Sequence, residues 1–231
     1  MNLVRQHLDV LLRLPLQSQG PVGANLRSWA ASLRPSLPIA MLEQLPETDL
    51  CRDRLRIFCA KADISVTFLA VAAWGGMHRL HASRAWQARA NWGVALESLR
   101  SSNRTRGEDF AILHELQLAK MFPGVGAPYF TKLLFFLRPK SDAYIMDQWT
   151  AKSVNLLTGQ DVVKISPAGW VGPENSQERY EEFCCIVDEL ARRLGCTGSE
   201  AEHALISKGG RHPWKWREYV KANFPSRPQK R

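Results

Sequence analysis

Apolar residues recur at intervals of three and four along most of this 231-residue chain, and this spacing constrains its fold more than any other feature. It places the apolar side chains of a helix on one stripe. The clearest run ends at Gly195 and consists of Tyr180, Phe183, Cys184, Val187, Leu190, Ala191 and Leu194. Further helices are expected near residues 2–14, 48–60, 64–73, 83–101, 107–120, 148–157, 198–207 and 213–223. The sequence therefore predicts an all-α protein.

One segment has the composition of a strand. Residues 162–165 read Val-Val-Lys-Ile, which fits a short strand but equally an extended segment that crosses between helices. The Pro- and Gly-rich stretch 166–173 that follows predicts a connector.

A Pro-Gly-x-Gly turn separates two of the expected helices. The first helix covers residues 110–121, and Pro123 cannot continue it because proline has no N–H to donate. The glycines within 124–126 can adopt positive φ without a steric penalty. A second helix is expected to begin at Ala127, with Pro128 in its first turn, where a missing N–H costs little.

This hairpin, residues 110–137, is a candidate DNA-binding element. The candidate contacts are Gly124, Val125, Gly126 and Ala127, because outward-facing amides at a helix N-terminus accept an anion such as a DNA phosphate. The same turn also occurs at helix corners that serve only packing. From the turn alone, DNA binding and packing both remain open.

The distribution of charge favours a polyanionic partner. The formal net charge is +9 and the isoelectric point is about 9.6. Between residues 79 and 106 the only acid is Glu97, and between 205 and 231 it is Glu218. The basic residues of these segments are Arg79, Arg84, Arg89, Arg100, Arg104, Arg106, Lys208, Arg211, Lys215, Arg217, Lys221, Arg227, Lys230 and Arg231. Arg104, Arg106 and Lys215 are taken as candidate DNA contacts.

Other classes of protein are disfavoured by composition. The five cysteines form no C-x-x-C pair and no ordered spacing with histidines, so we expect free thiols and no metal bound by side chains. No segment approaches the roughly 20 apolar residues of a membrane span. We expect a cytoplasmic monomer with no membrane partner and no cofactor.

Asp147 lies 19 residues after Pro128 and directly precedes the expected helix 148–157. An aspartate at this position caps the helix by accepting backbone N–H groups, and it is expected to remain ionised because it feels the positive end of the helix dipole. Aspartate is also a common cap with no chemical role.

The segment 122–126, the apolar helix after it and Asp147 together resemble the helix–hairpin–helix DNA glycosylase superfamily. Residues 128–133 and 146–155 are similar to bacterial proteins grouped as 8-oxoguanine DNA glycosylase-like, and the similarity covers about residues 107–157. The resemblance implies a single domain over 1–231 with two lobes and an active-site cleft between them. The hairpin lobe is expected over about 61–157, and the second lobe over about 1–60 plus 158–231.

The resemblance implies an enzyme that flips a modified base out of double-stranded DNA and hydrolyses its N-glycosidic bond, with Asp147 as the catalytic residue. Bifunctional relatives carry a lysine where this chain has Pro128. Proline cannot form a Schiff base, so a monofunctional enzyme that leaves an abasic site is expected. Lys132 lies one helical turn later and faces the same way. Four roles are open for Lys132: contact with the base, contact with a phosphate, a displaced lyase nucleophile, or a solvated helix lysine with no role in the site.

Further site residues are suggested less directly. Pro128, Lys132, Trp74, Trp149 and Trp214 are candidates for the base pocket, and so is Trp216. Asn103 with Arg104 and Arg106 would supply the wedge that fills the gap left by the base. The resemblance also implies that the carbonyls of Phe122 and Val125 hold a monovalent cation.

The resemblance leaves the substrate and the biological role open. An oxidised purine such as 8-oxoguanine and a bulky phage-type modified cytosine both fit, with roles in DNA repair or anti-phage defence at the bacterial nucleoid. The alternative from a different class is a non-catalytic DNA-binding protein.

Overall fold

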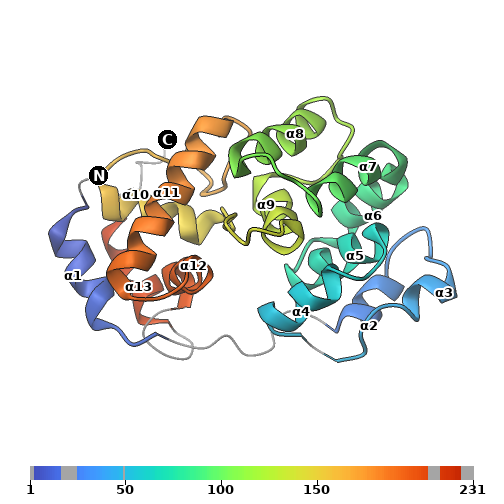
Figure 1. Ribbon diagram of the computed structural model, residues 1–231, viewed down its shortest axis with the longest axis horizontal. Helices are drawn as coiled ribbons and strands as arrows, with labels where there is room; N and C mark the ends of the chain where they lie inside the picture. Colours follow the sequence, from blue (N-terminus) through green and yellow to red (C-terminus); the bar gives the residue numbers. More distant parts are fainter. Residues whose placement is uncertain (1–2, 17–24, 49, 208–213, 225–231) are drawn as a thin grey trace. The chain divides into compact units, whose positions relative to one another are not determined.

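The computed structural model describes residues 3–16, 25–48, 50–207 and 214–224 (Figure 1). This part of the chain forms thirteen helices and no strand, which confirms the all-α class. By internal contacts the chain divides into two compact units, which are described separately. Unit 1 comprises Met1–Ser18 and Tyr144–Arg231, and unit 2 comprises Gln19–Ala143.

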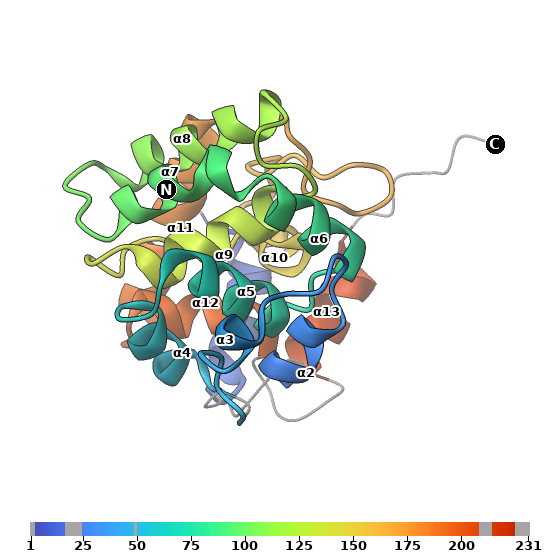
Figure 2. The ribbon, with the colours of Figure 1, turned by 90° about the vertical axis from the view of Figure 1, so that its right-hand side faces the viewer.

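Unit 2 is built around α5, a helix that is apolar on all sides. Residues 66–74 are all buried, and Asp63 caps the helix by accepting the amides of Ser65 and Val66. The helices α2, α4 and α9 pack around it (Figure 2). The helices of this unit are α2 (Leu26–Ala31), α3 (Ile39–Leu42), α4 (Arg52–Cys59), α5 (Ile64–Trp74), α6 (Arg79–Gln87), α7 (Arg89–Leu99), α8 (Arg106–Leu118) and α9 (Ala127–Leu137).

Unit 1 is built around α10 and the long amphipathic α11. Gly195 ends α11 in the left-handed conformation, as the sequence predicts. The helix α10 packs against the four other helices of the unit. These helices are α1 (Arg5–Arg13), α10 (Gln148–Thr158), α11 (Gln177–Leu194), α12 (Gly198–Ser207) and α13 (Lys215–Asn223).

The unit boundaries differ from the lobe boundaries expected from the sequence. Residues 25–60 join the hairpin because α2 packs on α5 and because α4 packs on α5 and α9. Residues 144–157 join the other unit because α10 packs on α1, α11, α12 and α13. Both differences arise from contacts between helices far apart in sequence, and the local spacing of apolar residues does not predict such contacts.

One local expectation changes, and the structure decides between two alternatives at a second place. The expected helix 83–101 is split into α6 and α7 at Ala88, and the indole N–H of the buried Trp92 donates to the Ala85 carbonyl across the break at 2.8 Å. The segment 162–165 forms no strand. The side chains of Asn155 and Asn175 bond the backbone N–H and C=O of Val163 and Lys164, at 2.8 to 2.9 Å. A single bridge pairs Ile165 with Val171, so the segment is an extended crossing.

No helix within the described ranges is both long enough and apolar enough to cross a membrane.

Candidate active site and nucleic-acid interface

In the hairpin of unit 2, the second helix begins at Ala127 as the sequence predicts, whereas the first helix, α8, begins and ends earlier than the expected 110–121. Thr105 and Glu108 form a capping box at the start of α8, and α9 begins at Ala127 with Pro128 in its first turn. Gly124 has φ +78°, and a Cβ at this position would lie 3.0 Å from the Cα, Cβ and carbonyl oxygen of His81. A glycine is therefore required here both by backbone conformation and by close approach to α6.

Two buried side chains hold the turn between α8 and α9 in place, and one backbone amide of the turn is hydrogen-bonded within it. Phe122 and Val125 are 1% and 2% exposed, and the Phe122 ring stacks on Trp92 with centroids 5.1 Å apart. The amide of Val125 donates to the Phe122 carbonyl at 3.3 Å, so it is used within the turn. The amides of Gly124, Gly126 and Ala127 donate to no other described residue and remain the candidates for a phosphate.

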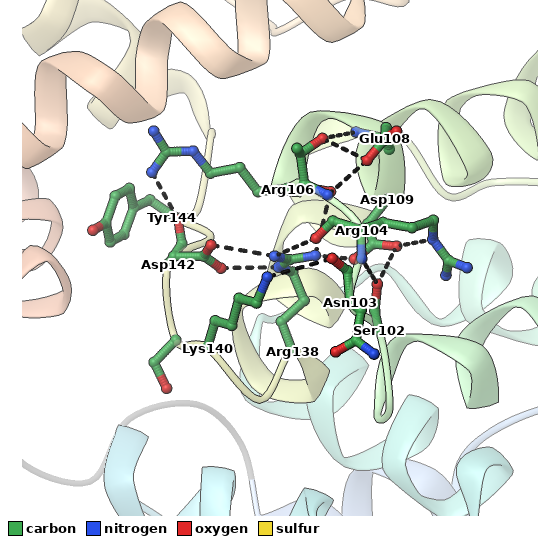
Figure 3. Close-up of polar contacts among 12 residues, drawn as sticks. Ser102, Asn103, Arg104, Arg106, Glu108, Asp109, Arg138, Lys140, Asp142 and Tyr144 are labelled. Atoms are coloured by element: carbon green, nitrogen blue, oxygen red, sulfur yellow. Dashed lines mark hydrogen bonds and ion pairs between the residues drawn. The ribbon is translucent and has the colours of Figure 1, made fainter.

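Arg104 and Arg106, two of the DNA contacts that the sequence predicts, are both hydrogen-bonded within unit 2. Arg104 donates through Nε to Asp109 Oδ1 at 2.6 Å, and the 8%-exposed Arg106 donates through Nη1 to the Asp142 carbonyl at 2.9 Å. Figure 3 shows both guanidinium groups within one polar network, in which the Asn103 carbonyl also accepts from Lys140 at 3.4 Å. Arg106 is buried and would have to lose its bond to the Asp142 carbonyl to contact DNA, whereas the Arg104 side chain is 37% exposed.

Other exposed basic residues of the segment 79–106 lie on α6 and at the start of α7. Arg79, Arg84 and Arg89 are all exposed. The turn at Gly124 contacts His81, so α6 lies directly beside the hairpin turn.

Asp147 caps α10 in unit 1, as the sequence predicts. Its Oδ1 accepts the amides of Trp149 at 2.8 Å and Thr150 at 3.1 Å, while its own amide donates to the Thr150 hydroxyl at 2.9 Å. Its second carboxylate oxygen, Oδ2, accepts no hydrogen bond from any described residue. The carboxylate is thus fixed through one oxygen, and the other is available for chemistry.

Around the first turn of α10 lies a group of aromatic and basic side chains, which we call the tryptophan–arginine cluster: Trp149, Lys152, Trp214, Arg217 and Lys221. The Arg217 Cζ lies 4.5 Å from the centroid of the Trp149 ring and 4.1 Å from that of Trp214. The amines of Lys152 and Lys221 lie 5.0 and 5.8 Å from the Trp149 centroid. Burial lowers the pKa of Arg217, whereas the negative charges of Asp147 and Glu218 act in the opposite direction.

The sequence predicts Trp149 and Trp214 as residues of the base pocket, but it does not single out any of the three basic residues of this cluster as a DNA contact. A signal was present, because residues 214, 217 and 221 recur at helical spacing and therefore share one face of α13. Lys215, the remaining candidate on this helix, is exposed on its first turn.

The other pocket candidates lie in the interior of their units. In unit 2, Lys132 is 8% exposed, and its amine donates to the Pro128 carbonyl at 2.8 Å, so it does face the same way as Pro128. Trp74 is 7% exposed and packs edge-on against Phe136, which leaves little of its ring for a base. In unit 1, Trp216 is fully buried and donates to Ser153 Oγ at 3.0 Å.

Within the described residues no group of three or more His, Cys, Asp or Glu side chains is placed to hold a metal ion. The cation expected at the hairpin would use carbonyls instead. The Phe122 carbonyl already accepts the Val125 amide, and its second lone pair remains compatible with a monovalent ion.

A family model described as "Putative 8-oxoguanine DNA glycosylase OGG-like protein" matches residues 17–206, which include the hairpin and Asp147. Neither the curated proteins nor the solved structures contain a match to the chain. The family match extends well beyond the 107–157 segment that carried the resemblance. The chain therefore belongs to the 8-oxoguanine DNA glycosylase OGG-like family.

Proposed function

We propose that this protein is a monofunctional DNA glycosylase that hydrolyses the N-glycosidic bond of a modified nucleotide. The observation that carries the proposal is the state of Asp147, whose Oδ1 is held by two backbone amides while Oδ2 has no described partner. A family whose description names a DNA glycosylase supports it. The hairpin of unit 2 supplies DNA-binding amides, and Asp147 of unit 1 supplies the carboxylate.

The chemistry assigned to Asp147 has two parts. As the bond between C1′ and the base nitrogen breaks, its electron pair leaves with the base, and the negative carboxylate stabilises the positive charge that develops on the sugar. The Oδ2 atom then accepts a proton from a water molecule whose oxygen bonds to C1′. The departing base takes up one proton and Asp147 gives up the one it accepted, so the products are the free base and an abasic site in an intact strand.

The substitution Asp147→Asn tests this role. Asparagine is an equally good N-cap, so α10 and the DNA affinity should be retained, while base release should fall about 10²- to 10⁴-fold because the general base is lost. The measurement is single-turnover release of the base from a duplex that wild-type protein processes.

Asp63→Asn is the matched control, because Asp63 caps α5 in the same way and has no proposed role in catalysis. Equal activity losses in the two variants would show that Asp147 is only a cap. If wild-type protein converts no modified duplex to an abasic site, the alternative of a non-catalytic DNA-binding protein is favoured.

The absence of strand cleavage follows from Pro128, which cannot form a Schiff base. Lys132 is the residue on which a lyase route would depend, and its amine is engaged with the Pro128 carbonyl. Incubation with a substrate duplex and borohydride should therefore trap no covalent adduct. An adduct that disappears in Lys132→Ala would establish the bifunctional alternative instead.

For the substrate we propose an oxidised purine such as 8-oxoguanine or a bulky phage-type modified cytosine. Genomic DNAs that carry these modifications should be incubated with the protein and the released bases identified by mass spectrometry. Release of an oxidised purine supports a repair role, and release of a modified cytosine supports defence against phage.

A further inference from the structure

Arg217 combines burial with an incomplete set of partners. Its guanidinium lies against the rings of Trp149 and Trp214, and its Nε is buried without a hydrogen-bond partner. Within the described residues it forms no ion pair, since the neighbouring Glu218 pairs with Lys221 at 2.7 Å. Arg217 is half-buried, and a buried Nε without a hydrogen-bond partner is energetically unfavourable, so this arrangement beside a proposed catalytic carboxylate points to a ligand.

The rest of the tryptophan–arginine cluster indicates the charge of that ligand. Burial lowers the pKa of Lys152, whose amine forms no ion pair with any residue of the described chain. Two cations without ion pairs therefore lie on the same indole, that of Trp149. The negative charges of Asp147 and Glu218 both act on Arg217, but one oxygen of Asp147 is used as a helix cap and Glu218 pairs with Lys221. The cluster therefore has an excess of positive charge and favours an anion.

We propose that Arg217 binds a backbone phosphate that flanks the nucleotide whose base is released, which rests on the glycosylase function proposed above. A planar guanidinium matches the geometry of a phosphate through paired N–H donors, and stacking on two indoles limits its rotation. The Trp149 and Trp214 rings thus act as supports that orient the guanidinium.

Phosphate binding by Arg217 would also affect the reaction electrostatically. A free cation near Asp147 repels the positive charge that develops on the sugar, and a bound phosphate neutralises this cation. Arg217 is thereby a positioning residue that makes the charge beside the reacting sugar depend on DNA binding. Its loss should appear mainly in DNA affinity and less in the rate at saturating DNA.

The test measures binding without catalysis. In an Asp147→Asn background, the affinity for a short duplex carrying a tetrahydrofuran abasic-site analogue is measured as a function of KCl concentration. Arg217→Gln should weaken binding about 10-fold and reduce the slope of log K against log [salt] by about one. Arg217→Lys should recover part of the affinity, because the charge returns without the planar fork.

Arg192→Gln is the matched control, since Arg192 is an exposed arginine of the same unit that already pairs with Glu189 at 2.8 Å. It should leave the affinity and the salt slope nearly unchanged. Circular dichroism and thermal melting of each variant check that the fold is retained.

A second duplex locates the phosphate. Replacing one of the phosphates that flank the analogue by a neutral methylphosphonate should weaken binding of the parent protein but not of the Arg217→Gln protein. Additive losses at both flanking phosphates, or a loss of affinity in Arg217→Gln that leaves the salt slope unchanged, would overturn the proposal. Because no catalytic step is involved, this result is separate from the outcome of the Asp147→Asn activity test.

Discussion

At the scale of single residues, unit 2 depends on a buried ion pair between Asp109 and Arg138 (Figure 3). Both side chains are 0% exposed, and Asp109 also accepts from Arg104 and from the Ser102 hydroxyl at 2.9 Å. Burial lowers the pKa of Arg138, but its bonds to Asp142 and Asp109 outweigh this, and the pKa is raised overall. The pair connects the start of α8 to the end of α9, so it holds together the two helices of the hairpin.

The substitution Asp109→Ala should lower the free energy of unfolding by about 3–5 kcal/mol, because it leaves the buried guanidinium of Arg138 without this partner. Asp142→Ala should lower it by only about 1 kcal/mol, since the Asp142 side chain is 36% exposed and water screens its interaction. Urea unfolding followed by circular dichroism gives both values. Equal losses in the two variants would contradict the assigned importance of burial.

At the scale of elements, the turn between α8 and α9 is shaped by its contact with α6. Gly124 and Gly195 both have positive φ, at +78° and +65°. A Cβ added at Gly195 meets no atom within 4 Å, whereas at Gly124 it meets the His81 backbone at 3.0 Å. The two glycines therefore separate the effect of backbone conformation from that of a tertiary contact.

We expect Gly195→Ala to lower the free energy of unfolding by about 1–2 kcal/mol, which is the conformational penalty alone. Gly124→Ala adds the displacement of the turn and should lose about 1–3 kcal/mol more. If the hairpin binds DNA, Gly124→Ala should also weaken affinity for an undamaged duplex, while Gly195→Ala should not. Denaturant unfolding and fluorescence anisotropy provide the two measurements.

At the scale of the whole molecule, the formal net charge is larger than the positive charge that is free to bind DNA phosphates. The chain carries a net charge of +9, yet some of its arginines are used internally. Arg100 donates to the carbonyls of Cys59 and Ala62, and Arg104 binds Asp109. Arg84 is exposed and forms no ion pair with any other described side chain. An exposed arginine without an ion pair, such as Arg84, is the kind that releases counterions when it binds a phosphate.

Arg84→Gln should therefore weaken DNA binding at all sequences and reduce the slope of log K against log [salt] by about one. Arg104→Gln removes the same formal charge but should change stability rather than the slope, because its guanidinium is bonded to Asp109. Anisotropy titrations over a range of KCl concentrations, with thermal melts alongside, distinguish these outcomes. A larger change of slope for Arg104→Gln would show that Arg104 contacts DNA after all.

Features governed by interactions between near neighbours were determined by the sequence itself. The helical class, the start of α9 at Ala127 and the cap at Asp147 depend on side-chain spacing and on groups within three or four residues. The candidate carboxylate and the hairpin could therefore be identified before any coordinates, and the family match includes both.

Only the tertiary structure decided which charged groups remain available and which residues surround Asp147. Arg106 is buried and bonded to the Asp142 carbonyl, Arg104 is bonded to Asp109, and Arg217 from the distant helix α13 lies on Trp149. The exclusion of residues 144–157 from the hairpin unit likewise depends on packing across the chain. Local periodicity contains no information about which distant side chain will neutralise a charge, because that choice is made by burial and packing of the complete fold.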